Sequence, residues 1–179
     1  TLAERLAVLN ALAARELDAD GIEALRSALG GANSVLAGKA AQIVGRRGIA
    51  MLYHLLPDTF ERFLVDSPKR DKRCHAKTEI VIALRACDIP AGEVFLQGAR
   101  FVQMEPAYGG PVDTAVTLRA ESALGLASLL HPNALLVLTN MLVDPEPSPR
   151  GAAARGLSYI GGEAAALLLR LKILTGDAD

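Results

Sequence analysis

The chain contains no tryptophan, and phenylalanine and tyrosine bring its aromatic content to only 4%. Strands favour aromatic and β-branched residues, so this scarcity argues against a sheet-based fold. Alanine and leucine carry the hydrophobicity instead, which is typical of helices that stack closely. Apolar residues make up 51% of the 179 positions, which excludes a disordered chain. This length is enough for one domain with a sizeable core.

The chain also lacks a surplus of positive charge, since its formal net charge is −1. Dedicated nucleic-acid binders usually carry a basic surplus, so nucleic acid is not the expected partner. No apolar run reaches the roughly 18 residues of a membrane-spanning helix. The amphipathic start TLAERLAVLNAL does not have the form of a signal peptide. We therefore expect a cytoplasmic protein without a membrane partner.

Cysteine is scarce, because Cys74 and Cys87 are the only two in the chain. If both lie on one helix, their separation along the axis is roughly 20 Å, whereas a disulfide requires Cα atoms within about 7 Å. We expect free thiols in a reducing compartment. Cys74 and His75 do not converge on a helix, and no CxxC or HxxxH spacing suited to zinc exists. The sequence predicts no metal site, no cofactor and no catalytic residue.

Apolar residues recur at three- and four-residue steps over most of the chain, which is the pattern of amphipathic helices. Ser67-Pro68 and Ser148-Pro149 each place a capping hydroxyl before a proline suited to the first helical position. Pro57 is expected to break or kink its helix. Strands have almost no support in this pattern, so the sequence predicts an all-α fold.

A repeat emerges when Ala37, Lys77, Thr117 and Arg150 are placed in register, at intervals of 40, 40 and 33 residues. Small or apolar residues recur three, six and seven positions after each of them, which is typical of a helix packed closely on its neighbours. A second apolar helix follows each of these, and another pair precedes them. The sequence thus predicts five pairs, each made of a first helix A and a second helix B. In the last four pairs the A helix lies near the aligned residue. The remaining helices are expected at about 2–17, 20–30, 48–66, 89–104, 132–143 and 161–175.

The segment DPEP opens the fifth pair at Asp144, and Asp177 in the segment GDAD follows 33 residues later. Repeat proteins normally finish with a polar capping unit, whereas here another unit would be expected to begin. We therefore expect residues 1–179 to form a single repeat domain that is a fragment of a longer solenoid.

The fifth unit, DPEPSPRGAAARGLSYIGGEAAALLLRLKIL, resembles the short bacterial HEAT-like repeats named after phycobilisome lyases. Their usual pattern is an acidic-proline turn followed by Arg, Ala-Ala, Leu and often Gly. The segment DTAVTLRAESALGLASL is similar to a lesser degree, and DKRCHAKTEIVIALRA and NSVLAGKAAQIVGRRG less again. The resemblance implies a right-handed α–α superhelix of about five helix pairs, with B helices lining a concave face. It implies no activity, because such repeats serve many functions.

The segment FVQMEPAYGGPVDTAVTLR, residues 101–119, stands out from the helical pattern. It inserts a longer connection between the third B helix and the fourth A helix, and such insertions in solenoids often serve binding. Two interpretations stay open, namely a structural turn held by capping and an ion pair, and a partner-binding loop. In the second, Tyr108 is the anchor and Arg119 orders Glu105 or Asp113. The partner-binding candidates are Gln103, Glu105, Tyr108, Asp113 and Arg119.

The segment SPKRDKRCHAKTE places several basic residues at one helix start, where positive charge opposes the helix dipole. An anionic ligand or an acidic protein partner would explain this placement. A solvated helix start also explains it, with Asp66, Asp71 and Glu79 as counter-ions. The anion-binding candidates are Lys69, Arg70, Lys72, Arg73 and Lys77.

These observations favour a non-enzymatic scaffold that binds a protein or peptide on the B-helix face and the inter-repeat loop. Two alternatives belong to other classes. One is a bilin-lyase-like enzyme subunit, which the repeat resemblance suggests through fold alone. The other is anion or nucleic-acid binding through residues 69–77, which predicts an affinity that falls steeply with salt.

Overall fold

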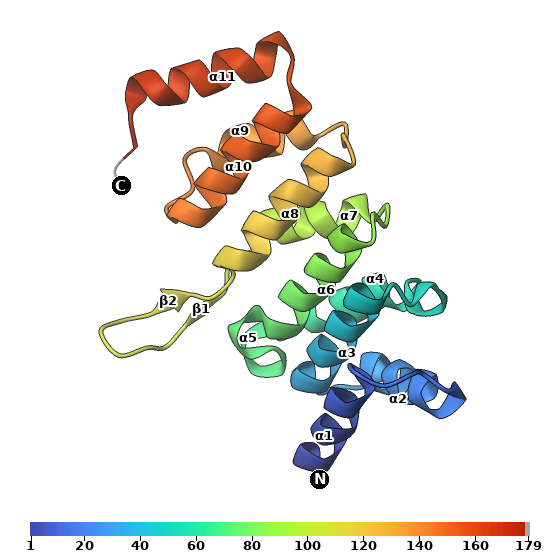
Figure 1. The fold of residues 1–179 in the computed structure, drawn as a ribbon. Helices are drawn as coiled ribbons and strands as arrows, with labels where there is room; N and C mark the ends of the chain where they lie inside the picture. The colour runs from blue at the N-terminus through green and yellow to red at the C-terminus, as the bar shows by residue number, and fades with distance from the viewer. Residues whose placement is uncertain (178–179) are drawn as a thin grey trace.

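The structure is a computed structural model that describes residues 1–177, and its regular secondary structure is almost entirely helical (Figure 1). The all-α prediction is thereby confirmed at the level of fold class. Most of the helices follow one another as pairs of an A helix and a B helix. The five pairs are α1 (Leu2–Leu12) and α2 (Ala19–Gly30), α3 (Ser34–Arg47) and α4 (Leu55–Leu64), α6 (His75–Ala86) and α7 (Gly92–Ala99), α8 (Val116–Ser128) and α9 (Ala134–Met141), and α10 (Pro147–Ile160) and α11 (Gly162–Thr175).

The A helices contact one another in chain order, from α1 through α3, α6 and α8 to α10 (Figure 1). Each of the first four B helices packs against the A helix of its own pair and against the A helix of the next pair. A single cluster of buried apolar side chains therefore runs from α1 to α11. This arrangement places the connections between successive pairs along the edges of the stack.

Most of the seam predicted from the repeat is buried in the structure, although Leu124 of the fourth unit is only half-buried. Ala40, Ile80, Ala120 and Ala153, three positions after the aligned residues, are each at most 6% exposed. Helices α3 and α6 approach each other closely at Gly45 of α3, where a Cβ atom would stand 2.7 Å from the Cα of Ala83. Only glycine fits that distance, because the neighbouring atom belongs to a backbone that cannot yield.

Four helices are shorter than predicted, at the positions assigned to about 2–17, 48–66, 89–104 and 132–143. Helix α1 ends at Leu12, where the Arg47 guanidinium donates hydrogen bonds to the carbonyls of Leu12 and Arg15. Gly48 ends α3 in the left-handed conformation. Pro57 does not break α4 but lies in its first turn, where backbone N–H groups have no partner within the helix.

The two predicted Ser-Pro caps are wrong. The short helix α5 (Ser67–Arg70) begins at Ser67 itself, and its N-cap residue, Asp66, makes no side-chain capping bond. The Ser67 hydroxyl is instead bonded to other side chains inside the protein. Helix α10 begins one residue before Ser148, because Pro147 already occupies the first helical position.

The prediction that strands have almost no support is wrong in one place. Strands β1 (Met104–Glu105) and β2 (Val112–Asp113) pair antiparallel, with Met104 opposite Asp113 and Glu105 opposite Val112. Strands of two residues are too short to show an alternating pattern in the sequence. The inserted segment is thus a β-hairpin that projects from the side of the stack (Figure 1).

Both cysteines are free thiols, as predicted. Cys74 ends the short 3₁₀ helix η2 (Lys72–Cys74) and is fully buried, whereas Cys87 is half-buried at the end of α6. Burial raises the pKa of Cys74 to about 11, although Lys77 and the Thr114 hydroxyl act in the opposite direction. The Cys74 thiol is therefore protonated at neutral pH and weakly nucleophilic.

This difference predicts the thiol chemistry of the native protein. We expect a disulfide exchange reagent to label one thiol per chain at neutral pH, and to reach Cys74 only after unfolding in denaturant. The variant Cys87→Ser is expected to lose the native reaction, while Cys74→Ser keeps it. Two thiols that react at the same rate in the native protein would contradict the assignment.

Within residues 1–177, no helix is both long enough and apolar enough to cross a lipid bilayer.

Candidate functional site

The hairpin is fixed at its base by one carboxylate oxygen of Glu105, which is half-buried. Its Oε1 accepts hydrogen bonds from the Arg73 backbone N–H at 2.6 Å, from Gln103 Nε2 at 2.6 Å and from Thr114 Oγ1 at 2.8 Å. Burial alone would raise the pKa of Glu105, but these donors outweigh it and lower the pKa below its ordinary value. Through its Oε1, Glu105 therefore ties β1 to η2.

Gln103 carries the connection deeper into the protein and is 2% exposed. Its Nε2 donates to the carbonyl of Asp71 at 2.9 Å, and its Oε1 accepts from the Ser67 hydroxyl. The Ser67 oxygen in turn accepts from Lys77 Nζ at 2.6 Å. This chain of bonds links the hairpin to α5 and α6, which belong to the preceding part of the sequence.

Lys77 is fully buried, which corrects its assignment as an anion-binding or solvated residue. Its Nζ lies 2.8 Å from Asp71 Oδ2 and also donates to the Phe63 carbonyl at 3.2 Å. The ring of Phe101 lies 5.1 Å from the same nitrogen, within cation–π range. Asp71 is also 0% exposed and accepts the backbone N–H groups of Ala76 and Lys77. Every polar atom of the pair thus has an internal partner, and neither charge is available to a ligand.

The sequence left open whether Arg119 pairs with Glu105 or with Asp113. In the structure Arg119 pairs with Asp113. Its Nη1 donates to Asp113 Oδ2 at 2.5 Å and to the Phe101 carbonyl at 3.0 Å. Its Nε and Nη2 hold Asp144 from the fifth unit at 2.8 and 3.0 Å. The guanidinium is 3% exposed, so it joins β2 and two repeat units rather than reaching toward solvent.

The pKa values of this cluster follow from the same contacts. Burial opposes the charged form of Asp113, but the N–H of Ala115, the Arg119 guanidinium and the N–H of Gln103 together lower its pKa below the ordinary value of 3.8. Burial likewise opposes the charge of Arg119, and the two carboxylates raise its pKa overall. Asp113 and Arg119 are therefore both charged at neutral pH and paired with each other.

The same acid-to-base spacing of six residues recurs at three places in the chain, and sequence reasoning missed it. The pairs are Asp71 with Lys77, Asp113 with Arg119, and Asp144 with Arg150. Arg119 also reaches forward to Asp144, and Arg150 reaches forward to Asp177 with Nε 2.8 Å from Oδ1. At these last two places, the aspartate that follows an A helix and its B helix thus meets the basic residue of that A helix.

This spacing also corrects the repeat register in the fourth unit. Thr117 is exposed, whereas Lys77 and Arg150 are buried. Arg119 is the buried basic residue that follows its unit's aspartate by six positions, so it is the structural counterpart of the other two. The hairpin lengthens the interval between the buried basic residues of the third and fourth units by two residues. The alignment of small residues could not detect this shift.

A groove with a volume of about 830 Å³ lies between the hairpin and the ends of α7 and α9. Apolar side chains that are largely exposed line it, with Met104 at 52% and Val143 at 77%. Val102 and Val112 add to the same lining, and the paired Arg119 lies along it. The hairpin forms one wall, and the B helix of the fourth unit with the following turn forms the other. Apolar surface in a concave site is typical of a binding site for a ligand or peptide.

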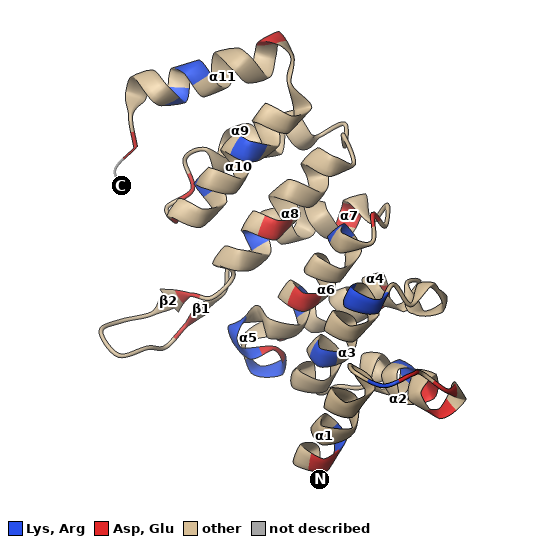
Figure 2. Ribbon diagram, in the orientation of Figure 1, with Lys and Arg blue, Asp and Glu red and all other residues tan. Residues whose placement is uncertain are grey.

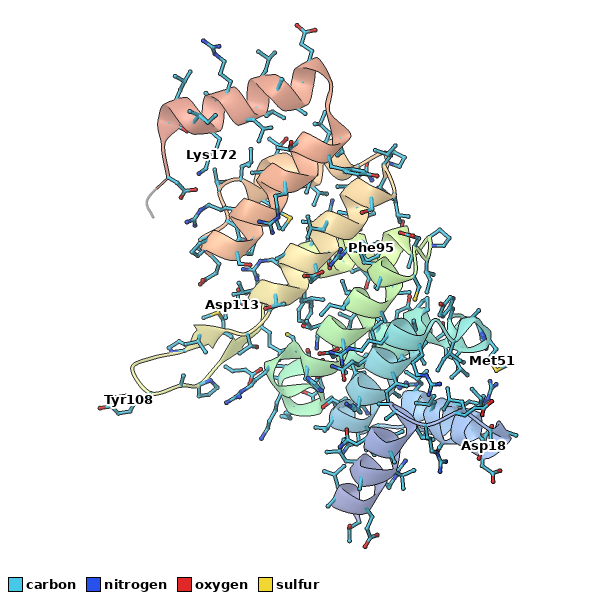
Figure 3. All side chains as sticks on the ribbon, viewed as in Figure 1. Asp18, Met51, Phe95, Tyr108, Asp113 and Lys172 are labelled. Atoms are coloured by element: carbon cyan, nitrogen blue, oxygen red, sulfur yellow. The ribbon has the colours of Figure 1, made fainter. Side chains whose placement is uncertain are left out.

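Tyr108 stands at the tip of the hairpin and points away from the body of the protein (Figure 3). It is fully exposed, and it does not line the groove. Its predicted role as an anchor therefore concerns a different surface from the groove, and that role stays a prediction.

Four of the five basic candidates remain exposed. Lys69, Arg70, Lys72 and Arg73 lie on α5 and η2, beside the base of the hairpin (Figure 2). Lys69 lies 3.6 Å from Asp66, in a pair that is largely solvated. The observed patch is thus smaller than predicted, because Lys77 is withdrawn into the core.

Cys74 and His75 belong to this region but do not act together. Cys74 Sγ lies 3.9 Å from the Thr114 hydroxyl, whereas His75 is exposed at the start of α6. Across the described part of the chain, no group of three or more His, Cys, Asp or Glu side chains is arranged to hold a metal ion.

No known protein-family model matches this chain, and a search among curated proteins found no match.

Proposed function

We propose that the chain is a HEAT-like, right-handed α–α solenoid that acts as a non-enzymatic interaction module. Its ligand is an extended apolar segment of a partner protein, and the binding site is the groove between the hairpin and α9. The single observation that carries this proposal is the set of exposed apolar side chains gathered in that groove. The chain order of the A-helix contacts supports the solenoid arrangement, because repeat units of this kind contact mainly their neighbours.

The anchoring of the hairpin supports a binding role for the groove. An unsupported two-stranded hairpin is marginally stable in water, but here Glu105 and Gln103 hold its base to residues 71–73, and Arg119 of α8 holds it at Phe101. A wall that is already ordered lowers the entropy cost of ligand binding. Gln103, Glu105 and Arg119 therefore contribute by positioning the hairpin, and contact with the ligand falls to Met104, Val112 and their neighbours.

The charge arrangement supports a role without catalysis. Asp113 and Arg119, which line the groove, are paired with each other, and Asp144 holds the other side of Arg119. General acid–base catalysis requires a group that exchanges a proton near the working pH. The lowered pKa of Asp113 and the raised pKa of Arg119 move both groups away from that range.

The free thiols fit the reducing cytoplasm, which we propose as the location.

A library of short random peptides, displayed and selected on the immobilised chain, tests this proposal. We expect enriched peptides to be rich in apolar residues, and their affinity to fall by about tenfold or more for Met104→Glu, since a charge in an apolar site costs at least about 1.4 kcal/mol. The matched control is Met51→Glu. Met51 is 59% exposed against 52% for Met104, and it lies on the side of the protein opposite the hairpin (Figure 3).

The outcomes separate the groove from the other candidate surfaces. Absence of enrichment, or equal loss of affinity with both variants, would overturn the groove as the binding site. Enrichment of acidic peptides that dissociate as salt rises, and that no longer bind Arg70→Glu, would instead assign binding to the basic patch on α5 and η2. Circular dichroism of each variant shows whether its helices are intact.

A further inference from the structure

The groove beside the hairpin is lined by five charged residues, and three of them are already paired with one another. Arg119 holds Asp113 and Asp144, and the three side chains are only 3%, 9% and 10% exposed. The other two charged residues are Arg100 and Glu146. Within residues 1–177, neither of these two side chains has a hydrogen-bond or ion-pair partner. One cation and one carboxylate in the groove are therefore available to a ligand.

Arg100 is the residue at which α7 ends, and its side chain is exposed. Its backbone is fixed, because its N–H donates to the carbonyl of Gln97 at 3.2 Å and the next carbonyl, that of Phe101, is held by Arg119. A guanidinium donates two parallel hydrogen bonds to a carboxylate and is weakly hydrated, which suits it to an ion pair beside apolar surface. Arg100 is thus a positioned donor for an acidic group of the ligand.

Glu146 is the N-cap residue of α10 and is half-buried. Its side chain does not cap the helix, and two of the residues that follow it, Pro147 and Pro149, have no N–H group to donate. Its own backbone N–H donates to Asp144 Oδ1 at 2.9 Å, which fixes the residue beside the paired cluster. A half-buried carboxylate without a donor is stabilised when a ligand supplies one. Glu146 is thus suited to a basic group of the ligand.

The two unpaired charges come from different pairs of the stack. Arg100 follows the B helix of the third pair, and Glu146 begins the A helix of the fifth pair (Figure 1). The fourth pair stands between them in the stack, and its helix α9 lines the same groove with the buried side chains of Val137 and Met141. A ligand that extends from the third pair to the fifth therefore meets a cation, then apolar surface, then a carboxylate. Opposite charges at the two places favour one direction of the bound segment.

We propose that the segment bound in the groove carries opposite charges on the two sides of its apolar centre. An acidic residue pairs with Arg100, the apolar centre contacts Met104 and Val143, and a basic residue pairs with Glu146. This inference rests on the proposed function, because it describes the ligand of the same groove. The basic patch on α5 and η2 takes no part, since none of its residues lines the groove.

A displayed library of peptides with a fixed centre of apolar residues and random flanks, selected on the immobilised chain, tests the proposal. On the unmodified chain we expect acidic residues to exceed basic ones at least about fivefold on one flank, and the reverse on the other flank. Arg100→Glu is expected to invert the preference on the first flank alone, and Glu146→Lys to invert that on the second flank alone. The matched control is Arg155→Glu, because Arg155 is exposed on α10 but does not line the groove, and it is expected to select the same peptides as the unmodified chain.

The outcomes distinguish this inference from the proposed function. Flank preferences that are absent, or that do not change in Arg100→Glu, overturn the inference alone if Met104→Glu still removes binding. Absence of any enriched peptide overturns both the inference and the proposed function. An acidic preference that is lost in Arg70→Glu but kept in Arg100→Glu also overturns the inference, and assigns the acidic contact to the basic patch.

Neutral variants keep the test valid if a reversed charge disturbs folding, which circular dichroism detects. Arg100→Gln and Glu146→Gln remove the charge and keep a polar side chain of similar length. Each is expected to abolish the preference on its own flank without inverting it. A neutral variant that is folded and keeps the full preference on that flank overturns the pairing assigned to its residue.

Discussion

Replacing Lys77 with methionine is expected to lower the free energy of unfolding by about 3–5 kcal/mol, because removal of one partner leaves a buried charge without compensation. Asp71 would keep the N–H groups of Ala76 and residue 77, but it would lose the cation at 2.8 Å. The Ser67 hydroxyl and the Phe63 carbonyl would lose a donor as well. The hairpin is bonded to the same cluster through Gln103, so its base would loosen in the variant.

Urea unfolding followed by circular dichroism measures this effect. The matched control is Lys69→Met, whose pair with Asp66 is solvated at 3.6 Å, and a loss of no more than about 1 kcal/mol is expected there. The double variant Asp71→Asn with Lys77→Met is expected to recover part of the loss, since no unpaired charge remains buried. A loss for Lys77→Met no larger than that of Lys69→Met would contradict the buried pair.

Replacing Arg119 with methionine is expected to have an effect of similar size, about 3–5 kcal/mol at neutral pH. The change strips the cation from Asp113 and Asp144, which are only 9% and 10% exposed. It also removes the donor to the Phe101 carbonyl at the root of the hairpin. The variant therefore weakens both the junction between the fourth and fifth units and the attachment of β2.

The pH dependence of this second effect has a definite sign. In the native protein the pKa of Asp113 lies below its ordinary value of 3.8, so its contribution to stability is present above that value and is lost as pH falls through the folded pKa. Without Arg119 the pKa of Asp113 rises, and the stabilisation by its carboxylate becomes smaller, because only the N–H groups of Ala115 and Gln103 still favour the charged form. The difference between native protein and Arg119→Met is expected to be largest near pH 7 and to shrink below about pH 4.

Arg85→Met is the matched control for this experiment. Arg85 joins α6 to Glu121 of α8 through contacts of 2.6 and 2.8 Å, but its side chain is 36% exposed against 3% for Arg119. A loss of at most about 1 kcal/mol, with little change between pH 7 and pH 4, is expected. If both arginine variants lost the same free energy of unfolding, burial of the Arg119 cluster would not determine how much the cluster contributes to stability.

The helices were predictable because their signal is local and repeated. Apolar residues at three- and four-residue steps identify each helix, and small residues at fixed offsets identify the seam, as Ala40 and Ala153 show by their burial. The ends of the helices depend on contacts from elsewhere in the chain. Arg47, which lies 35 positions from Leu12, bonds the carbonyls where α1 ends. Sequence periodicity contains no information about such a partner.

Sequence singled out the segment from which the hairpin forms, but it did not separate the residues that line the groove from those that hold the hairpin. The insertion of residues 101–119 does line the groove, since a long connection in a repeat array is visible without any structure. Gln103, Glu105 and Arg119 have the same side-chain chemistry whether they bind a partner or fix a hairpin. The burial of Gln103 and Arg119 favours the second role, and it depends on contacts with Ser67 and Asp144 from elsewhere in the chain. The basic residues divide for the same reason, with Lys77 inside and Lys72 outside.

The tip of the hairpin is mechanically separate from its base. Between Pro106 and Pro111 the backbone makes a single hydrogen bond to itself, from the N–H of Gly110 to the carbonyl of Ala107. A Cβ added at Gly109 or Gly110 would meet no atom within 4 Å. The bonds that hold the hairpin all lie at or before Glu105 and at or after Asp113. The tip is therefore a natural insertion point, where an affinity tag, a fluorophore or a foreign recognition loop can be carried without a change in the packing of the stack.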